Sequence, residues 1–146
     1  LFQRIALILQ EQETATGRCQ HILFLLITFA ERNPGISRML TGEALTGETD
    51  RLRHQVNQIF ERIETQLRQV LREAELREGL RPVLPLPAAA ELLMATAEGR
   101  IAQFVRSEFK RRPSEDWHAQ MSYLMGDFFR EVPSAGTAAD GELRTG

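Results

Sequence analysis

The sequence predicts an all-α fold in a single domain. Its 146 residues are close to the roughly 150 of a typical domain. With 42% hydrophobic and 26% charged side chains, it has the composition of a globular protein rather than of a disordered chain or a membrane span. Apolar residues recur every three or four positions, as on one face of a helix, and no segment shows the alternation of a strand.

Three helices are predicted in the first part of the chain. Apolar side chains recur at helical spacing over residues 1–13 and again over residues 16–32. Pro34 and Gly35 then interrupt the pattern, because a proline disfavours helical geometry at the residue before it. A short third helix is expected over residues 36–45.

Two longer helices and a final one are predicted after these. Residues 50–78 repeat apolar side chains in steps of four and three, which predicts one long helix, and a glycine follows that is well placed to end it. Three prolines make residues 80–87 an extended linker. Residues 88–112 form the next long helix, which Pro113 ends, and the last helix continues through Phe128.

The domain is expected to comprise residues 1–132. Residues 133–146 contain too few apolar side chains to pack, which predicts a disordered tail. The chain starts at Leu1 without an initiator methionine or signal peptide, so we expect that a segment precedes it. The formal net charge of −2 argues against bulk electrostatic capture of nucleic acid. A lone cysteine, Cys19, excludes an internal disulfide and favours the reducing cytoplasm.

No cluster of residues predicts catalysis, a cofactor or a metal site. The histidines His21, His54 and His118 fall on three different predicted helices, without a nucleophile or an acid–base partner at a useful spacing. Cys19 and His21 are two positions apart on a helix and point to different faces, so they are not expected to share a metal. We therefore expect a binding module rather than an enzyme.

Two polar features are candidates for binding. Basic side chains gather in the second half of the helix predicted over residues 88–112, namely Arg100, Arg106, Lys110, Arg111 and Arg112. The helix dipole accounts for cations there, and a nucleic-acid-binding stripe is the alternative. The second feature is Arg32 with Asn33 at a helix end, where an arginine fork and an amide could grip a peptide. Its alternative is a tight turn with a solvated arginine.

Three segments of the chain resemble the nucleoid occlusion factors, a branch of the TetR family. They run from Phe29 to Leu45, from Asn57 to Glu73 and from Phe104 to Pro113. The resemblance implies a TetR-type C-terminal regulatory domain, in which the last two long helices form a four-helix-bundle dimer interface with a second copy. The implied interface residues are Ala97, Gly99, Ile101, Ala102, Phe104, Trp117, Met121, Leu124 and Phe128.

The resemblance also implies a function. Proteins of this branch bind DNA through an N-terminal helix-turn-helix, and when bound to DNA they engage the C-terminal tail of the tubulin-like division protein FtsZ. This disrupts Z-ring assembly over the nucleoid. Binding to DNA is therefore expected only through a domain missing from this sequence, and the protein is expected on the nucleoid in the cytoplasm, with no membrane partner.

In this branch the FtsZ tail lies in a groove between the helix that leaves the DNA-binding domain and the next helix. Here these are the helices predicted over residues 1–13 and 16–32. Carried over by position, the groove would contain Arg4 as a charge partner, Leu25 as an apolar wall, and Arg32 with Asn33 at its polar end. Thr28 stands where the branch usually has a glycine, which is expected to narrow the groove.

The alternative function is that of an ordinary TetR repressor, whose domain encloses a small apolar inducer. Such a protein needs an internal cavity of roughly 300 Å³ or more instead of a surface groove. Large side chains are available to fill that space, and these are Phe24, Phe29, Ile59, Phe60 and Phe104.

Overall fold

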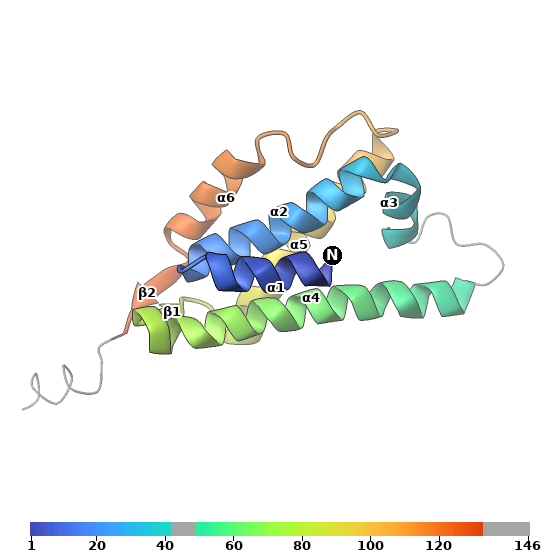
Figure 1. The fold of residues 1–146 in the computed structure, drawn as a ribbon. Coiled ribbons are helices and arrows are strands. Elements are labelled where there is room, and N and C mark those ends of the chain that lie inside the picture. Colours follow the sequence, from blue (N-terminus) through green and yellow to red (C-terminus); the bar gives the residue numbers. More distant parts are fainter. Residues whose placement is uncertain (42–48, 133–146) are drawn as a thin grey trace, which may run out of the picture.

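The computed structural model describes residues 1–41 and 49–132, and it confirms the all-α class (Figure 1). Within these residues, the elements follow in the order α1 (Phe2–Glu11), α2 (Ala15–Arg32), α3 (Pro34–Leu40), α4 (Thr49–Glu78), β1 (Leu80–Pro82), α5 (Leu86–Arg106), α6 (Trp117–Gly126) and β2 (Phe129–Glu131). The predicted tail over residues 133–146 and the predicted last turn of the third helix lie outside the described residues.

Short polar contacts set the bounds of α2 and α3. Thr14 caps α2, because its Oγ1 accepts a hydrogen bond of 3.0 Å from the amide of Gly17. The helix ends before Pro34, as predicted, and α3 begins at this proline rather than at residue 36. Proline suits the first turn of a helix, where no amide hydrogen is required. Ser37 then joins the two helices, since its buried hydroxyl donates to the carbonyl of Ala30.

The long helix α4 agrees with the prediction to within one residue. Gly79 follows it with a φ of +67°, the left-handed conformation that commonly ends a helix and that glycine adopts without steric cost. Its amide still donates to the carbonyl of Glu75. The chain can therefore turn away sharply after Glu78.

The described residues also contain a small two-stranded sheet that no sequence pattern predicted. Part of the expected linker, β1, pairs antiparallel with β2, and Arg81 lies opposite Arg130. The last helix also ends at Gly126, two residues before the predicted Phe128, and the chain then enters β2. Each strand has only three residues, which is too short to show an alternating pattern, so only the pairing identifies them.

The helix predicted to reach residue 112 ends six residues earlier, at Arg106. Glu108 and Phe109 adopt positive φ values of 56° and 67°, and the Phe109 amide donates to the carbonyl of Phe104 at 2.8 Å. The two phenylalanine rings also pack edge to face, with centroids 5.2 Å apart. Hydrogen bonds and an apolar contact of this kind typically close a helix. The basic residues 110–112 consequently lie in the following loop, beyond the helix dipole that was expected to account for them.

The core lies where α2, α4 and α5 pack against one another. Figure 1 shows α1 running along α2 on one side, α6 across α2 on the other, and α3 at the far end of the bundle. The large side chains that are almost fully enclosed are Ile5, Ile22, Leu23, Leu26, Ile27, Ile63, Leu67, Leu71, Leu93, Met94, Ile101 and Trp117. Every helix except α3 contributes to this set, so α1 is part of the fold and not an appendage.

Candidate functional site

A groove of about 420 Å³ lies between α1 and α2. The two helices form a hairpin, since only residues 12–14 separate them, and α1 runs back along α2 (Figure 1). The groove is lined by Arg4, Leu7, Ile8, Glu11, His21, Phe24, Leu25, Thr28 and Arg32. Its lining is apolar along the middle, with charged side chains toward both ends.

Three of the four residues predicted for peptide binding line this groove. Arg4 comes from α1, while Leu25 and Arg32 come from α2. Both arginines are exposed, and Leu25 is half-buried. The hairpin brings Arg4 toward the half of α2 that carries Arg32, so that two guanidinium groups serve the same end of the groove.

The fourth residue, Asn33, is not among the residues that line the groove. It terminates α2, and its Nδ2 donates a hydrogen bond of 2.7 Å to the carbonyl of Phe29. The backbone N–H of Asn33 also donates to the carbonyl of Ala30. In this structure Asn33 therefore stabilises the corner next to Arg32, and its side chain is engaged by the backbone.

Thr28 lies in the groove wall with its hydroxyl already bonded. Its Oγ1 donates to the carbonyl of Phe24 at 2.8 Å and approaches the carbonyl of Leu25 at 3.2 Å. Phe24 in turn packs against His118 of α6, with ring centroids 4.9 Å apart. Thr28 thus adds volume where a glycine would add none, and α6 supports the wall from behind.

Arg18 holds the groove together, and no sequence pattern singled it out. Its side chain is buried, and its Nε and Nη2 donate to the carbonyls of Gln12 and Leu9 at 2.8 and 2.7 Å. Its Nη1 lies 3.6 Å from a carboxylate oxygen of Glu73 on α4. One guanidinium therefore satisfies carbonyls at the end of α1 and joins both groove helices to α4.

The other end of α1 is attached to α4 by a cation–π contact. The guanidinium carbon of Arg62 lies 3.7 Å from the centre of the Phe2 ring. A further bond joins α2 to the last turn of α4, because the amide of Ala15 donates to Glu78 at 2.8 Å. The groove is consequently a preformed feature, supported from α4 at both of its ends.

The residues predicted for a dimer interface do not share one surface. Six are buried inside the chain and at most 7% exposed, namely Ala97, Ile101, Phe104, Trp117, Met121 and Phe128. Gly99 and Ala102 are exposed on α5, and Leu124 is half-buried on α6. The residues that the resemblance implies therefore combine an inner and an outer face of α5 with buried and half-buried positions in and after α6.

Cys19 and His21 diverge, as the helical spacing predicted. Cys19 is fully buried, whereas His21 is exposed and its Nδ1 lies 2.7 Å from the carbonyl oxygen of Gly17. In the described ranges, no three histidine, cysteine, aspartate or glutamate residues are arranged to hold a metal ion. None of the helices in these ranges is both long and apolar enough to span a membrane.

Burial raises the pKa of the Cys19 thiol to about 12, with a smaller contribution from the negative charge of Glu78. Only the thiolate is nucleophilic, so the folded chain is expected to resist alkylation by iodoacetamide at mildly alkaline pH. The same chain in denaturant should be labelled within minutes, which mass spectrometry can follow. Rapid labelling under native conditions would show that Cys19 is accessible.

Residues 12–128 match a protein family of SlmA-like C-terminal domains, described as tetracyclin repressor-like. The nucleoid occlusion factor SlmA of Shewanella woodyi is 55% identical over 124 residues, which are 85% of this chain and 63% of that protein. SlmA of Colwellia psychrerythraea is 50% identical over 127 residues, or 87% and 64%. The chain thus spans just under two thirds of these relatives, and it belongs to the SlmA-like family of TetR-type C-terminal domains.

Proposed function

We propose that this domain acts in nucleoid occlusion by binding the C-terminal tail of FtsZ in the α1–α2 groove. The observation that carries the proposal is the groove itself, because one hollow contains Arg4, Leu25 and Arg32. The family resemblance implies these three side chains as tail contacts. Two of them come from one helix and the third from the other, so it is the hairpin that brings them together.

The chemistry of the groove favours a peptide with both acidic and apolar side chains. Arg4 and Arg32 can each offer a bidentate fork to a carboxylate. Leu7 is 52% exposed at the rim, and together with Ile8 and Leu25 it offers an apolar surface for side chains of the peptide. Glu11 lies toward the hairpin turn and would repel an acidic residue there, which favours one direction of the peptide in the groove.

We also propose that two copies pair through the exposed face of α5. Leu92, Ala95, Gly99 and Ala102 follow one another at steps of three and four residues, and all four are exposed. This spacing places them on one side of the helix, and the small residues would let a second helix approach closely. Recognition of DNA is assigned to the helix-turn-helix that the family resemblance implies, outside these 146 residues.

Titration of this chain with a peptide of the FtsZ C-terminal tail tests the groove. In calorimetry, Leu25→Glu and Arg32→Asp are each expected to weaken binding by more than about tenfold, equivalent to about 1.4 kcal/mol. The first change places a charge against the apolar wall, and the second reverses the charge that faces the peptide carboxylate.

Two matched controls make the same chemical changes outside the groove. Leu76→Glu alters a side chain that is 89% exposed on α4, and Arg38→Asp alters an exposed arginine on α3. Both controls should bind the peptide as the unmodified chain does. Affinity in both groove variants equal to that of the unmodified chain would refute the assignment.

A further inference from the structure

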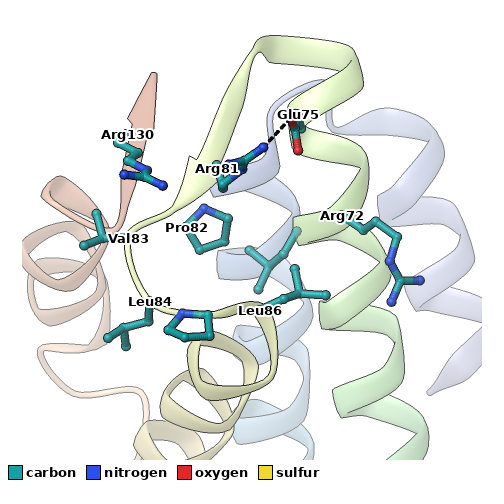
Figure 2. A pocket seen from close by; sticks show the side chains of 10 residues that line it. Arg72, Glu75, Arg81, Pro82, Val83, Leu84, Leu86 and Arg130 are labelled. Atoms are coloured by element: carbon teal, nitrogen blue, oxygen red, sulfur yellow. Dashed lines mark hydrogen bonds and ion pairs between the residues drawn. The ribbon is translucent and has the colours of Figure 1, made fainter. Parts of the chain in front are cut away.

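A second hollow, of about 360 Å³, lies beside the two-stranded sheet (Figure 2). It is formed by the last turns of α4, by β1 and the loop that leads to α5, and by β2. The lining residues are Leu71, Arg72, Glu75, Arg81, Pro82, Val83, Leu84, Pro85, Leu86 and Arg130. None of them lines the α1–α2 groove, so the two hollows are separate sites.

Three arginines from three different elements surround this hollow. Arg72 comes from α4, Arg81 from β1 and Arg130 from β2, and all three are exposed. The one acidic residue in the lining, Glu75, pairs with Arg81 at 2.7 Å. Across the described part of the chain, this is the one ion pair that any of the three arginines makes. The hollow therefore has an excess of positive charge.

The position of Arg130 makes this excess of positive charge destabilising to the two-stranded sheet. Arg81 and Arg130 are directly opposite each other in the antiparallel register. Like charges at such a pair of positions destabilise a sheet, because side chains at opposing positions lie on the same face. An anion bound between the two guanidinium groups would remove this repulsion and accept hydrogen bonds from both.

The part of the lining below Arg130 and Arg81 in Figure 2 is apolar and rigid. Figure 2 shows the arginines along the upper and right-hand rim, with Val83, Leu84 and Leu86 on the left and below. Val83 and Leu84 are 58% and 43% exposed, so two neighbouring apolar side chains are open to solvent at the edge of the hollow. Pro82 and Pro85 restrict this loop, and the Val83 amide is bonded to the carbonyl of Phe128 at 2.9 Å.

We propose that this hollow binds a small amphipathic anion, with a carboxylate or phosphate head and a short apolar body. The head lies between Arg130 and Arg81, and the body lies against Val83 and Leu84. The volume falls within the usual range for small-molecule sites, about 300–1,000 Å³. The wall and the strands are already in place, so binding requires little ordering of the chain.

Calorimetric titration with three eight-carbon probes tests the site. Octanoate and octyl phosphate carry the two head groups, and octanol carries the same body without a charge. Saturable binding of either anion, with octanol at least about tenfold weaker, supports the proposal, and the tighter of the two anions identifies the head group. Equal binding of octanol, or no saturable binding of either anion, would overturn it.

Two variants and one control locate the bound anion. Arg130→Gln is expected to weaken binding about tenfold through the loss of one charge-assisted hydrogen bond, and Val83→Asp should weaken it further by repulsion. Arg77→Gln removes the same charge from an exposed position on α4 outside the hollow and should leave the affinity unchanged. Equal weakening by Arg77→Gln and Arg130→Gln would indicate a general charge effect and would refute the site.

Thermal unfolding separates loss of binding from loss of structure. Arg130→Gln removes the cross-strand repulsion with Arg81, so its Tm is expected to be equal to or above that of the unmodified chain. The eight-carbon anion that binds more tightly should raise the Tm of the unmodified chain and of Arg77→Gln. It should raise the Tm of Arg130→Gln much less. The same increase in all three would contradict the placement of the anion beside Arg130.

Discussion

Replacing Arg18 by alanine is expected to lower the free energy of unfolding by about 2–4 kcal/mol. The guanidinium is buried and donates to the carbonyls of Leu9 and Gln12, which lose their side-chain donors in the variant. Glu73 is partly exposed, and its carboxylate can be hydrated instead, so the loss is smaller than for a fully buried ion pair. Urea-induced unfolding, followed by circular dichroism, measures the change.

The same substitution should also weaken the peptide groove. Arg18 attaches the end of α1 to α2 and α4, so its loss lets α1 separate from α2 without altering a groove residue. Amide hydrogen exchange should rise first in α1. Arg18→Lys should recover only part of the stability, because an ammonium lacks the planar fork that serves both carbonyls. Arg38→Ala, which changes an exposed arginine, is the control. If Arg18→Ala and this control had the same free energy of unfolding, the role assigned to Arg18 would be contradicted.

Trp117→Ala is expected to have the largest effect on stability, a loss of about 3–5 kcal/mol. The side chain is 1% exposed at the start of α6 and belongs to the main core. Its removal leaves a cavity that the surrounding helices fill only in part. A loss of this size is a large share of the 5–15 kcal/mol that typically stabilises a domain, so the midpoint of urea-induced unfolding should fall clearly below that of the unmodified chain.

Trp117→Phe should cost far less, about 1 kcal/mol, for a specific reason. Among the described residues, the indole Nε1 of Trp117 is the one buried side-chain nitrogen or oxygen without a hydrogen-bond partner. Phenylalanine removes this unpaired polar group, and the gain offsets part of the lost packing. Tyr123→Ala on the same helix is the control, since that side chain is 90% exposed and should change stability by less than about 0.5 kcal/mol. Equal losses for Trp117→Phe and Trp117→Ala would contradict this account.

Helical periodicity predicted α2 and α4 closely, because the pattern that encodes a helix lies within the helix itself. The apolar steps over residues 50–78 correspond to Thr49–Glu78, and the proline after Asn33 ends α2 where expected. Periodicity was less successful at the end of α5. The turn at Glu108 and Phe109 depends on two left-handed residues that are not glycine, and no local pattern indicates such a turn.

The groove was predicted from the family resemblance and not from residue patterns. Residue chemistry alone favoured a tight turn with a solvated side chain at Arg32 over a peptide contact. Arg4 and Leu25 gain a shared environment only when α1 folds back along α2. No sequence pattern indicated a role for Arg18, because an arginine near the start of a helix is usually hydrated. The burial of Arg18 depends on the carbonyls at the end of α1, which come from another helix.

The sequence by itself determined the class of the fold, the number of its main helices and its family, because these depend on spacings and strings of residues within continuous segments. Only the tertiary structure decided which side of α5 is core, that β1 pairs with β2, and that three arginines from separate elements surround one hollow. The physical reason is that such contacts join residues far apart in the chain, and the packing of the helices selects among many pairings that the sequence leaves open.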